Sequence, residues 1–173
     1  GSYADYNIAI GYYSLYNVLN GANNIGIGFR ALYSNLADYN VAIGYYSMNS
    51  NTTGDKNVAI GYYTMTDNTT GYNNTAIGYA AYENGTNGYS NTAIGTNALA
   101  TITSGAGNTA IGVDAAKSTT GYSNTALGIS ALANNTSGTR IVAIGDFTGG
   151  TEINNSYCTF IGSAASTNSV GPY

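Results

Sequence analysis

Few side chains in this 173-residue chain could perform acid–base chemistry. It contains no histidine and one cysteine, Cys158, so histidine-based triads, the common general bases and zinc sites have no residues to form them. Carboxylates remain, because Asp38 and Asp55 each stand six residues before a repeated glycine, as does Asp5. Carboxylates about 5 Å apart suit retaining glycoside hydrolysis. Nothing else in the repeat builds a cleft around them, so we expect no enzyme and no cofactor.

Tyrosine, with 18 copies, is the second residue type that could carry function. The position after the repeated glycine is aromatic in five consecutive repeats, and the next position adds further rings. These residues are Tyr12, Phe29, Tyr45, Tyr62 and Tyr79, with Tyr13, Tyr46 and Tyr63 beside them. Rings at repeat spacing either stack as a structural ladder or form a platform for sugars or protein ligands, because tyrosine has an apolar face and a polar tip. The row stops after the fifth repeat, which places any such platform in the N-terminal half.

Asn-x-Ser/Thr sequons are a third feature, since they are acceptors for N-glycans in secreted proteins. They begin at Asn51, Asn68, Asn73, Asn84, Asn134, Asn135 and Asn154. Several are expected by chance in a chain so rich in Asn and Thr. Asn51 and Asn68 hold equivalent corner positions, where glycans would coat one ridge of the molecule.

Charge is scarce: only 7% of the residues are charged, against roughly 25% in a typical soluble domain. The net charge is −4, and no basic stripe exists that could neutralise a phosphate backbone, so nucleic acid is not an expected partner. No apolar run approaches the roughly 20 residues that a membrane helix needs. Cys158 has no partner for an intrachain disulfide and is interpreted as a small buried hydrophobic residue.

An internal repeat organises the whole sequence. The tripeptide Ala-Ile-Gly and its variants recur in steps of 16 or 17 residues without a break. The repeated glycines are Gly11, Gly28, Gly44, Gly61, Gly78, Gly95, Gly112, Gly128, Gly145 and Gly162. Residues 1–173 are therefore predicted to form one continuous domain of ten coils.

The residues around each glycine favour β-structure. A β-branched residue stands three before the glycine and Ile or Leu directly before it, with Ala between them in eight repeats. Such alternation is typical of a short strand, and corners such as Asn51-Thr52-Thr53-Gly54 supply turns. The prediction is an all-β, single-chain parallel β-solenoid of ten coils of about 17 residues, with two strands of about five residues in each coil.

Side chains alternate across a strand, so the β-branched residue and the Ile share one face and the Ala takes the other. We expect the larger pair to point into the coil and the Ala to point outward as a flat strip for contact with another chain. This candidate subunit interface consists of Ala9, Ala42, Ala59, Ala76, Ala93, Ala110, Ala126 and Phe160. The alternative places Ala inside a very narrow roll and Ile outside.

Asparagine precedes the β-branched residue in the first eight repeats. These residues are predicted to form a structural ladder of stacked amides: Asn7, Asn24, Asn40, Asn57, Asn74, Asn91, Asn108 and Asn124.

The run Asn57-Val58-Ala59-Ile60-Gly61 resembles the head repeat of YadA-like trimeric autotransporter adhesins, which repeat a close variant of Asn-Ser-Val-Ala-Ile-Gly. Similar repeats occur in phage tail fibres and large surface proteins. The resemblance implies a left-handed parallel β-roll, three parallel chains, surface display and binding to host matrix. The family's usual repeat is shorter, and its neck, coiled-coil stalk and membrane anchor do not occur in this sequence.

Three functions compete at this point. The first is the head of an extracellular or cell-surface adhesin or fibre, a homotrimer that binds carbohydrate or an extracellular-matrix protein without inserting into a membrane. The second is a filament subunit that stacks end to end, since an uncovered solenoid end can pair with further strands. The third is ice binding, which needs a flat threonine row. Thr75, Thr92, Thr109 and Thr125 form such a row, but on the face assigned to the interior.

Overall fold

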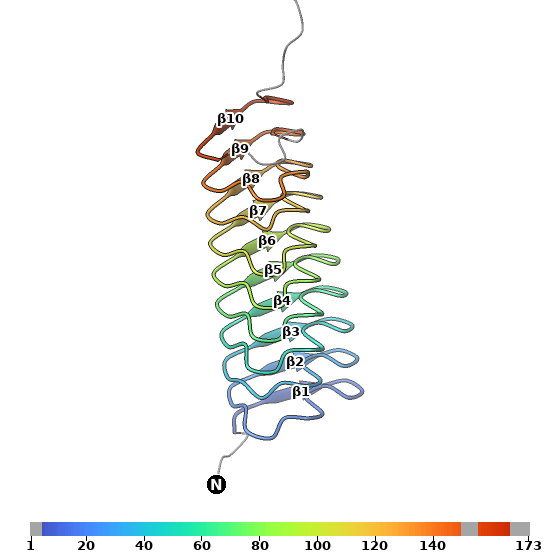
Figure 1. Ribbon diagram of the computed structural model, residues 1–173. Helices are drawn as coiled ribbons and strands as arrows, with labels where there is room; N and C mark the ends of the chain where they lie inside the picture. The colour runs from blue at the N-terminus through green and yellow to red at the C-terminus, as the bar shows by residue number, and fades with distance from the viewer. Residues whose placement is uncertain (1–4, 150–155, 167–173) are drawn as a thin grey trace, which may run out of the picture.

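The computed structural model describes residues 5–149 and 156–166. Ten three-residue strands form one parallel sheet in which spatial order follows sequence order. The strands are β1 (Ile8–Ile10), β2 (Ile25–Ile27), β3 (Val41–Ile43), β4 (Val58–Ile60), β5 (Thr75–Ile77), β6 (Thr92–Ile94), β7 (Thr109–Ile111), β8 (Thr125–Leu127), β9 (Val142–Ile144) and β10 (Thr159–Ile161). Figure 1 shows the coils stacked in chain order, which confirms the predicted all-β parallel solenoid.

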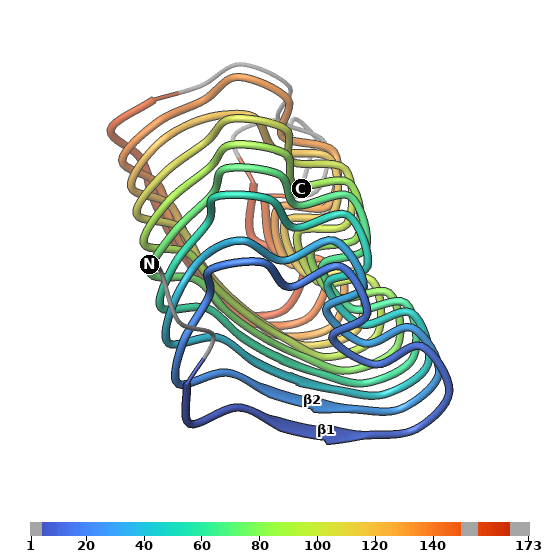
Figure 2. The same cartoon turned by 90° about the horizontal axis from the view of Figure 1, so that it is seen from below.

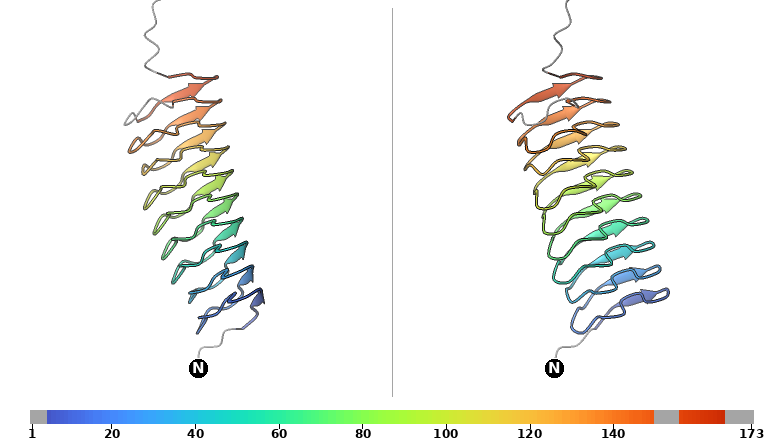
Figure 3. Two further views of the ribbon diagram at one scale, coloured as in Figure 1. Left: turned by 90° about the vertical axis from the view of Figure 1, so that its right-hand side faces the viewer. Right: turned by 45° about the vertical axis from the view of Figure 1, so that its right-hand side comes forward.

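The strands keep the register of the repeat, with Thr75 opposite Thr92, Ala76 opposite Ala93 and Ile77 opposite Ile94. They lie along one side of the rod, as Figure 3 shows. Each strand ends at its repeated glycine, where the chain turns with a positive φ of +136° at Gly78. A Cβ on Gly78 would lie 2.6 Å from the carbonyl oxygen of Gly95 in the next coil. The corner therefore requires glycine for both backbone conformation and space.

The predicted second strand of each coil is wrong, because the chain after the glycine forms turns. Two residues per coil there have left-handed backbone conformations, for example Tyr46 and Met48 with φ of 56° and 50°. A third left-handed residue stands five before the glycine, such as Lys56 with φ of 56°. Each costs about 1–2 kcal/mol. Together they close the coil into the tight outline that Figure 2 shows along the rod axis.

The strand faces are opposite to those expected, and the Ala strip is not a subunit interface. Ala42, Ala59, Ala76, Ala93, Ala110 and Ala126 are 0–1% exposed and lie in the core, as does Phe160 in β10. Ala9 belongs to the same inner face, because it pairs with buried Gly26, although it is itself exposed in β1. The Ile side chains point outward, and Ile77 is 37% exposed.

The narrow interior explains this orientation. Facing the Ala row are the long side chains four residues after the glycine, including Leu32, Met48, Met65, Leu99 and Leu132, which are buried as expected. In β2, where Gly26 replaces Ala, even a Cβ would lie 2.6 Å from Oγ of Ser14. This coil has no room even for a methyl group, and the coils with Ala hold one long side chain and one methyl group at this level. Phe160 fits in β10 because its ring lies 3.3 Å from the place of a Cβ on Gly149, where other coils carry a larger residue.

The rest of the interior is polar, and the predicted asparagine ladder is confirmed. From Asn24 to Asn124 these residues are buried. Asn74 Oδ1 accepts a hydrogen bond from the backbone N–H of Asn91 at 2.9 Å, and Asn74 Nδ2 donates to the carbonyl oxygen of Gly88 at 2.8 Å. The same pair of bonds recurs at Asn40, with Asn57 and Gly54. Each amide thus joins two coils, and its polar atoms are satisfied without water.

A second buried polar row lies seven residues after the glycine. Asn51 Nδ2 donates to Oδ1 of Asn35 at 2.6 Å, and Asn68 Nδ2 donates to Oδ1 of Asn51 at 2.7 Å. The row is interrupted at Gly85, where the ring of Tyr82 occupies the space of the missing amide. The Tyr82 hydroxyl accepts a hydrogen bond from Asn91 Nδ2 at 3.1 Å. Burial raises the pKa of Tyr82 well above its usual range, so this hydroxyl stays protonated.

The Tyr82–Gly85 pair is expected to be strongly coupled in stability. Tyr82→Leu alone leaves a cavity and removes a bond to Asn91, costing about 2 kcal/mol. Gly85→Asn alone drives an amide into the Tyr82 ring, with a similar cost. The double variant has the same combination of Leu and Asn that the second coil has at Leu32 and Asn35. It should therefore recover most of the lost stability. Urea unfolding of the four proteins measures the coupling, and additive losses would contradict the exchange of volume.

Candidate binding faces

The aromatic row after the repeated glycine is a continuous ladder on the surface. The ring centroids are 5.8 Å apart for Tyr12–Phe29, 5.1 Å for Phe29–Tyr45, 4.7 Å for Tyr45–Tyr62 and 5.8 Å for Tyr62–Tyr79. The ring planes differ by 14° or less. The rings therefore stack on each other and still present an outer surface, and Tyr79 at the end of the row is 55% exposed. Both interpretations of the row, structural ladder and ligand platform, are compatible with this geometry.

A second row of rings packs beside the ladder. Tyr46 and Tyr63 lie 5.7 Å apart, and Tyr13 is separated from Tyr46 by Arg30. The Arg30 guanidinium carbon lies 5.9 Å from the Tyr13 ring centroid and 5.6 Å from that of Tyr46, so the cation takes the place of a ring. A hydrogen bond with Tyr62 raises the pKa of Tyr63. All predicted platform residues thus lie together, and we define the tyrosine face as both rows with Arg30.

Two further pairs of stacked aromatic rings were not predicted from the sequence. Tyr16 and Tyr33, five residues after their glycines, stack at 5.6 Å and extend the tyrosine face. Tyr72 and Tyr89, six residues before theirs, stack at 5.1 Å on another corner. Repetition of tyrosine at the same repeat position is the signal that could have revealed both.

The sequons divide into buried and accessible positions. Asn51, Asn68 and Asn135 are completely buried, and their amide nitrogens donate to neighbouring coils or corners. The prediction of glycans at these three positions is therefore wrong for the folded chain, because the corner Asn points inward. Asn73 and Asn134 are exposed and Asn84 is half-buried, which leaves them as candidates. Asn154 lies outside the described residues.

The in-register carboxylates are engaged in local structure. Asp38 Oδ1 accepts a hydrogen bond from the Ala22 N–H at 2.7 Å, and Asp55 forms an ion pair with Lys56 at 2.7 Å. Among residues 5–149 and 156–166, no group of three His, Cys, Asp or Glu side chains could hold a metal ion. Cys158 is half-buried against the core. In the same described part, no helix is long and apolar enough to cross a bilayer.

The outer face of the sheet runs through all ten strands of the rod. One of its rows consists of Ile10, Ile27, Ile43, Ile60, Ile77, Ile94, Ile111, Leu127, Ile144 and Ile161. The parallel row consists of Ile8, Ile25, Val41, Val58, Thr75, Thr92, Thr109, Thr125, Val142 and Thr159. Neither row contains a charged residue, and all members are half-buried or exposed. We call this surface the sheet face.

Comparison with protein families, with curated proteins and with solved structures finds no match for this chain. The tyrosine face and the sheet face are therefore the two surfaces from which a function can be proposed.

Proposed function

We propose that the chain is a structural and adhesive rod of the cell surface or extracellular space, which associates with copies of itself through the sheet face. The single observation that carries this proposal is the two uncharged rows of the sheet face. Monomeric soluble proteins rarely expose contiguous apolar patches beyond a few hundred Å². Ten Ile or Leu side chains at coil spacing, with Ile111 39% exposed, form such a patch along the rod.

A second copy of the chain fits the sheet face better than an unrelated partner. Coils of a parallel solenoid repeat about every 4.8 Å, so another copy presents ridges and grooves at the same spacing. The rows are uncharged, so two copies meet without repulsion between like charges. Three parallel chains are the arrangement implied by the resemblance to trimeric adhesin heads, and the outward Val and Ile side chains would form the centre of such a trimer.

The tyrosine face supports the adhesive part of the proposal. Its residues begin just after the glycine that ends each strand, so they lie beyond the strand and outside the sheet face. Tyrosine and arginine are enriched at protein-binding surfaces, since they offer large rigid contact areas with polar tips. The ligands expected there are carbohydrate or an extracellular-matrix protein.

Self-association through the sheet face predicts a large change in mass. The double variant Ile77→Lys/Ile94→Lys places two charges in the contact and should reduce the mass in solution to that of one chain, because a desolvated unpaired charge costs several kcal/mol. The control Tyr79→Lys/Thr96→Lys adds the same charges to the same coils on another face. It should keep the wild-type mass.

Light scattering coupled to gel filtration measures these masses, and circular dichroism checks that each variant is folded. A monomeric wild type would contradict the proposed self-association. Long fibres in negative-stain images would instead favour the end-to-end filament.

Ice binding is a second candidate, favoured by one specific observation. The row Thr75, Thr92, Thr109 and Thr125 lies on the outer sheet face, beside a row of Ile and Leu. Flat, regular rows of hydroxyl and methyl groups are what ice binding needs. The two uses exclude each other, because a covered sheet face cannot contact ice. Thermal hysteresis of a monomeric wild type, abolished in Thr92→Lys, would support ice binding over self-association.

A further inference from the structure

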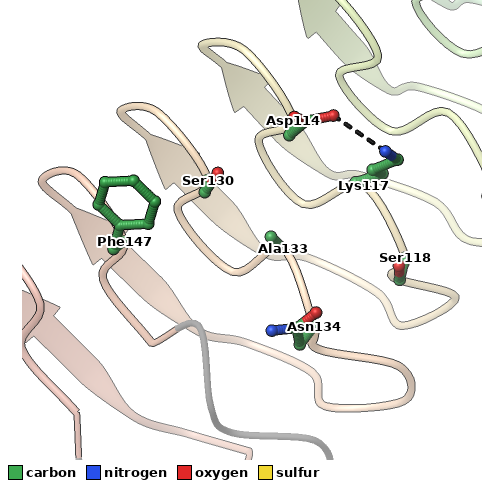
Figure 4. Close-up of a pocket in the computed structure, with 7 residues that line it drawn as sticks. All are labelled: Asp114, Lys117, Ser118, Ser130, Ala133, Asn134 and Phe147. Atoms are coloured by element: carbon green, nitrogen blue, oxygen red, sulfur yellow. Dashed lines mark ion pairs between the residues drawn. The ribbon is translucent and has the colours of Figure 1, made fainter.

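A hollow of about 560 Å³ lies on coils seven to nine, where the tyrosine face has ended. It is lined by Asp114, Lys117, Ser118, Ser130, Ala133, Asn134 and Phe147, drawn in Figure 4. Its volume is in the range of small-molecule sites in proteins.

The repeat explains why the surface is hollow at this place. Asp114, Ser130 and Phe147 stand two residues after their glycines, which is the position of Tyr13, Tyr46 and Tyr63 in earlier coils. Lys117 and Ala133 hold the position of Tyr16 and Tyr33, five after the glycine. Small side chains in coil eight replace the rings that fill this level in the N-terminal coils, so a groove opens beside the ring of Phe147.

The lining has the chemistry of a sugar site. Phe147 is 61% exposed, and among the described residues no other aromatic ring packs against it. Its free face can stack on the apolar C–H face of a sugar ring. The hydroxyl groups of Ser118 and Ser130 lie on the other parts of the lining, where sugar hydroxyls would need donors and acceptors.

The charges in the groove cancel. Lys117 Nζ lies 3.1 Å from Asp114 Oδ1, as the dashed line in Figure 4 marks. Burial alone would raise the pKa of Asp114, but hydrogen bonds from Asn97 and Lys117 and the Lys117 charge lower it, so the pair stays ionised at neutral pH. A neutral ligand is therefore favoured over an anionic one, because no uncompensated positive charge is present.

We infer that this groove is a binding site for a neutral oligosaccharide, with the Phe147 ring as the stacking surface and the Asp114–Lys117 pair and Ser130 as hydrogen-bonding groups. Three coils span about 10 Å along the rod, which fits two or three hexose rings. This inference deepens the adhesive function proposed above by naming a ligand class and a place for it outside the tyrosine face.

The probes are cellohexaose, chitohexaose, laminarihexaose and mannohexaose as neutral sugars, and hexagalacturonate as the anionic comparison. Titration calorimetry should detect binding of at least one neutral probe, with weaker binding of hexagalacturonate. Phe147→Ala should weaken the neutral probe by about ten-fold or more. Ser130→Tyr should abolish binding by filling the groove, and it should fold, because Tyr46 and Tyr63 occupy the equivalent position.

The control Tyr122→Ala removes an exposed ring on a different corner and should leave binding unchanged. Binding that survives Ser130→Tyr, stronger binding of hexagalacturonate, or no binding by any neutral probe would each overturn the inference. Loss of binding in Tyr45→Ala but not in Phe147→Ala would move the sugar to the tyrosine face. That result keeps the adhesive function and rejects the groove, while the solution mass tests self-association separately.

Discussion

Gly78→Ala should prevent the native stacking of coils five and six. The added Cβ would lie 2.6 Å from the Gly95 carbonyl oxygen and 2.8 Å from its carbon, and both are backbone atoms that cannot rotate away. The φ of +136° at Gly78 is also a conformation that L-residues rarely adopt. The free energy of unfolding should fall by more than about 4 kcal/mol, as measured by urea unfolding followed by circular dichroism.

Gly107→Ala is the matched control for this prediction. Gly107 also has a positive φ, 68°, but this is the left-handed region that side chains occupy at the same position in other coils. The nearest heavy atom to its added Cβ would be Ser123 Oγ at 3.6 Å. We expect a loss of only about 1–2 kcal/mol. Equal losses in the two variants would show that close approach of the coils is not what requires glycine at Gly78.

Asn74→Leu should cost about 3–5 kcal/mol, because it leaves several buried groups without partners. The backbone N–H of Asn91 loses its acceptor, and the carbonyl oxygen of Gly88 loses its donor. Both groups lie inside the roll, where water cannot replace the amide. Thermal and urea unfolding measure the loss, and local hydrogen exchange should increase first at Asn91.

The control is the neighbouring residue. Asn73→Ser changes an exposed side chain to the residue that Ser90 and Ser123 already provide at this position, so we expect a change within about 0.5 kcal/mol. Ile141 shows that a coil can lack the amide, but its own N–H still donates to Asn124 Oδ1 at 3.1 Å. An Asn74→Leu variant as stable as the wild type would contradict the role given to the ladder.

The parallel solenoid and the asparagine ladder were predictable because they depend on periodicity alone. An unbroken register of glycines fixes which residues stack, and a parallel stack makes every position a row. The tyrosine rows followed in the same way. Alternation along the strand correctly placed Ala42 on the face opposite Val41 and Ile43.

The direction of these faces could not be obtained from alternation, which leaves inside and outside undetermined. The width of the roll decides it, and the width depends on the turns. Residues such as Met48, Met65 and Tyr82 have left-handed backbone conformations, which cannot be predicted from their residue types. A coil without those turns would be wide enough to hold the side chains of Ile60 and Ile77 inside. For the same reason, Asn51 was predicted to be an accessible corner residue although it is buried. The threonine row was likewise predicted inside the coil although it lies on the outer face.

The groove on coils seven to nine was missed for a different reason. It is formed by the loss of large side chains at Ser130 and Ala133, and a missing ring is no motif in a single sequence. Comparing the positions two and five residues after each glycine across the coils would have shown where the surface becomes hollow.

The bonds between coils run along the rod, as from Val58 N–H to the Asn74 carbonyl oxygen at 2.8 Å. Tension applied along this axis loads the contacts at the end of the stack first, so coils would peel away one after another. Each released coil of about 17 residues lengthens the chain by about 50 Å when fully extended. A rod built in this way would lengthen stepwise under load and dissipate work coil by coil while the remaining coils stay stacked.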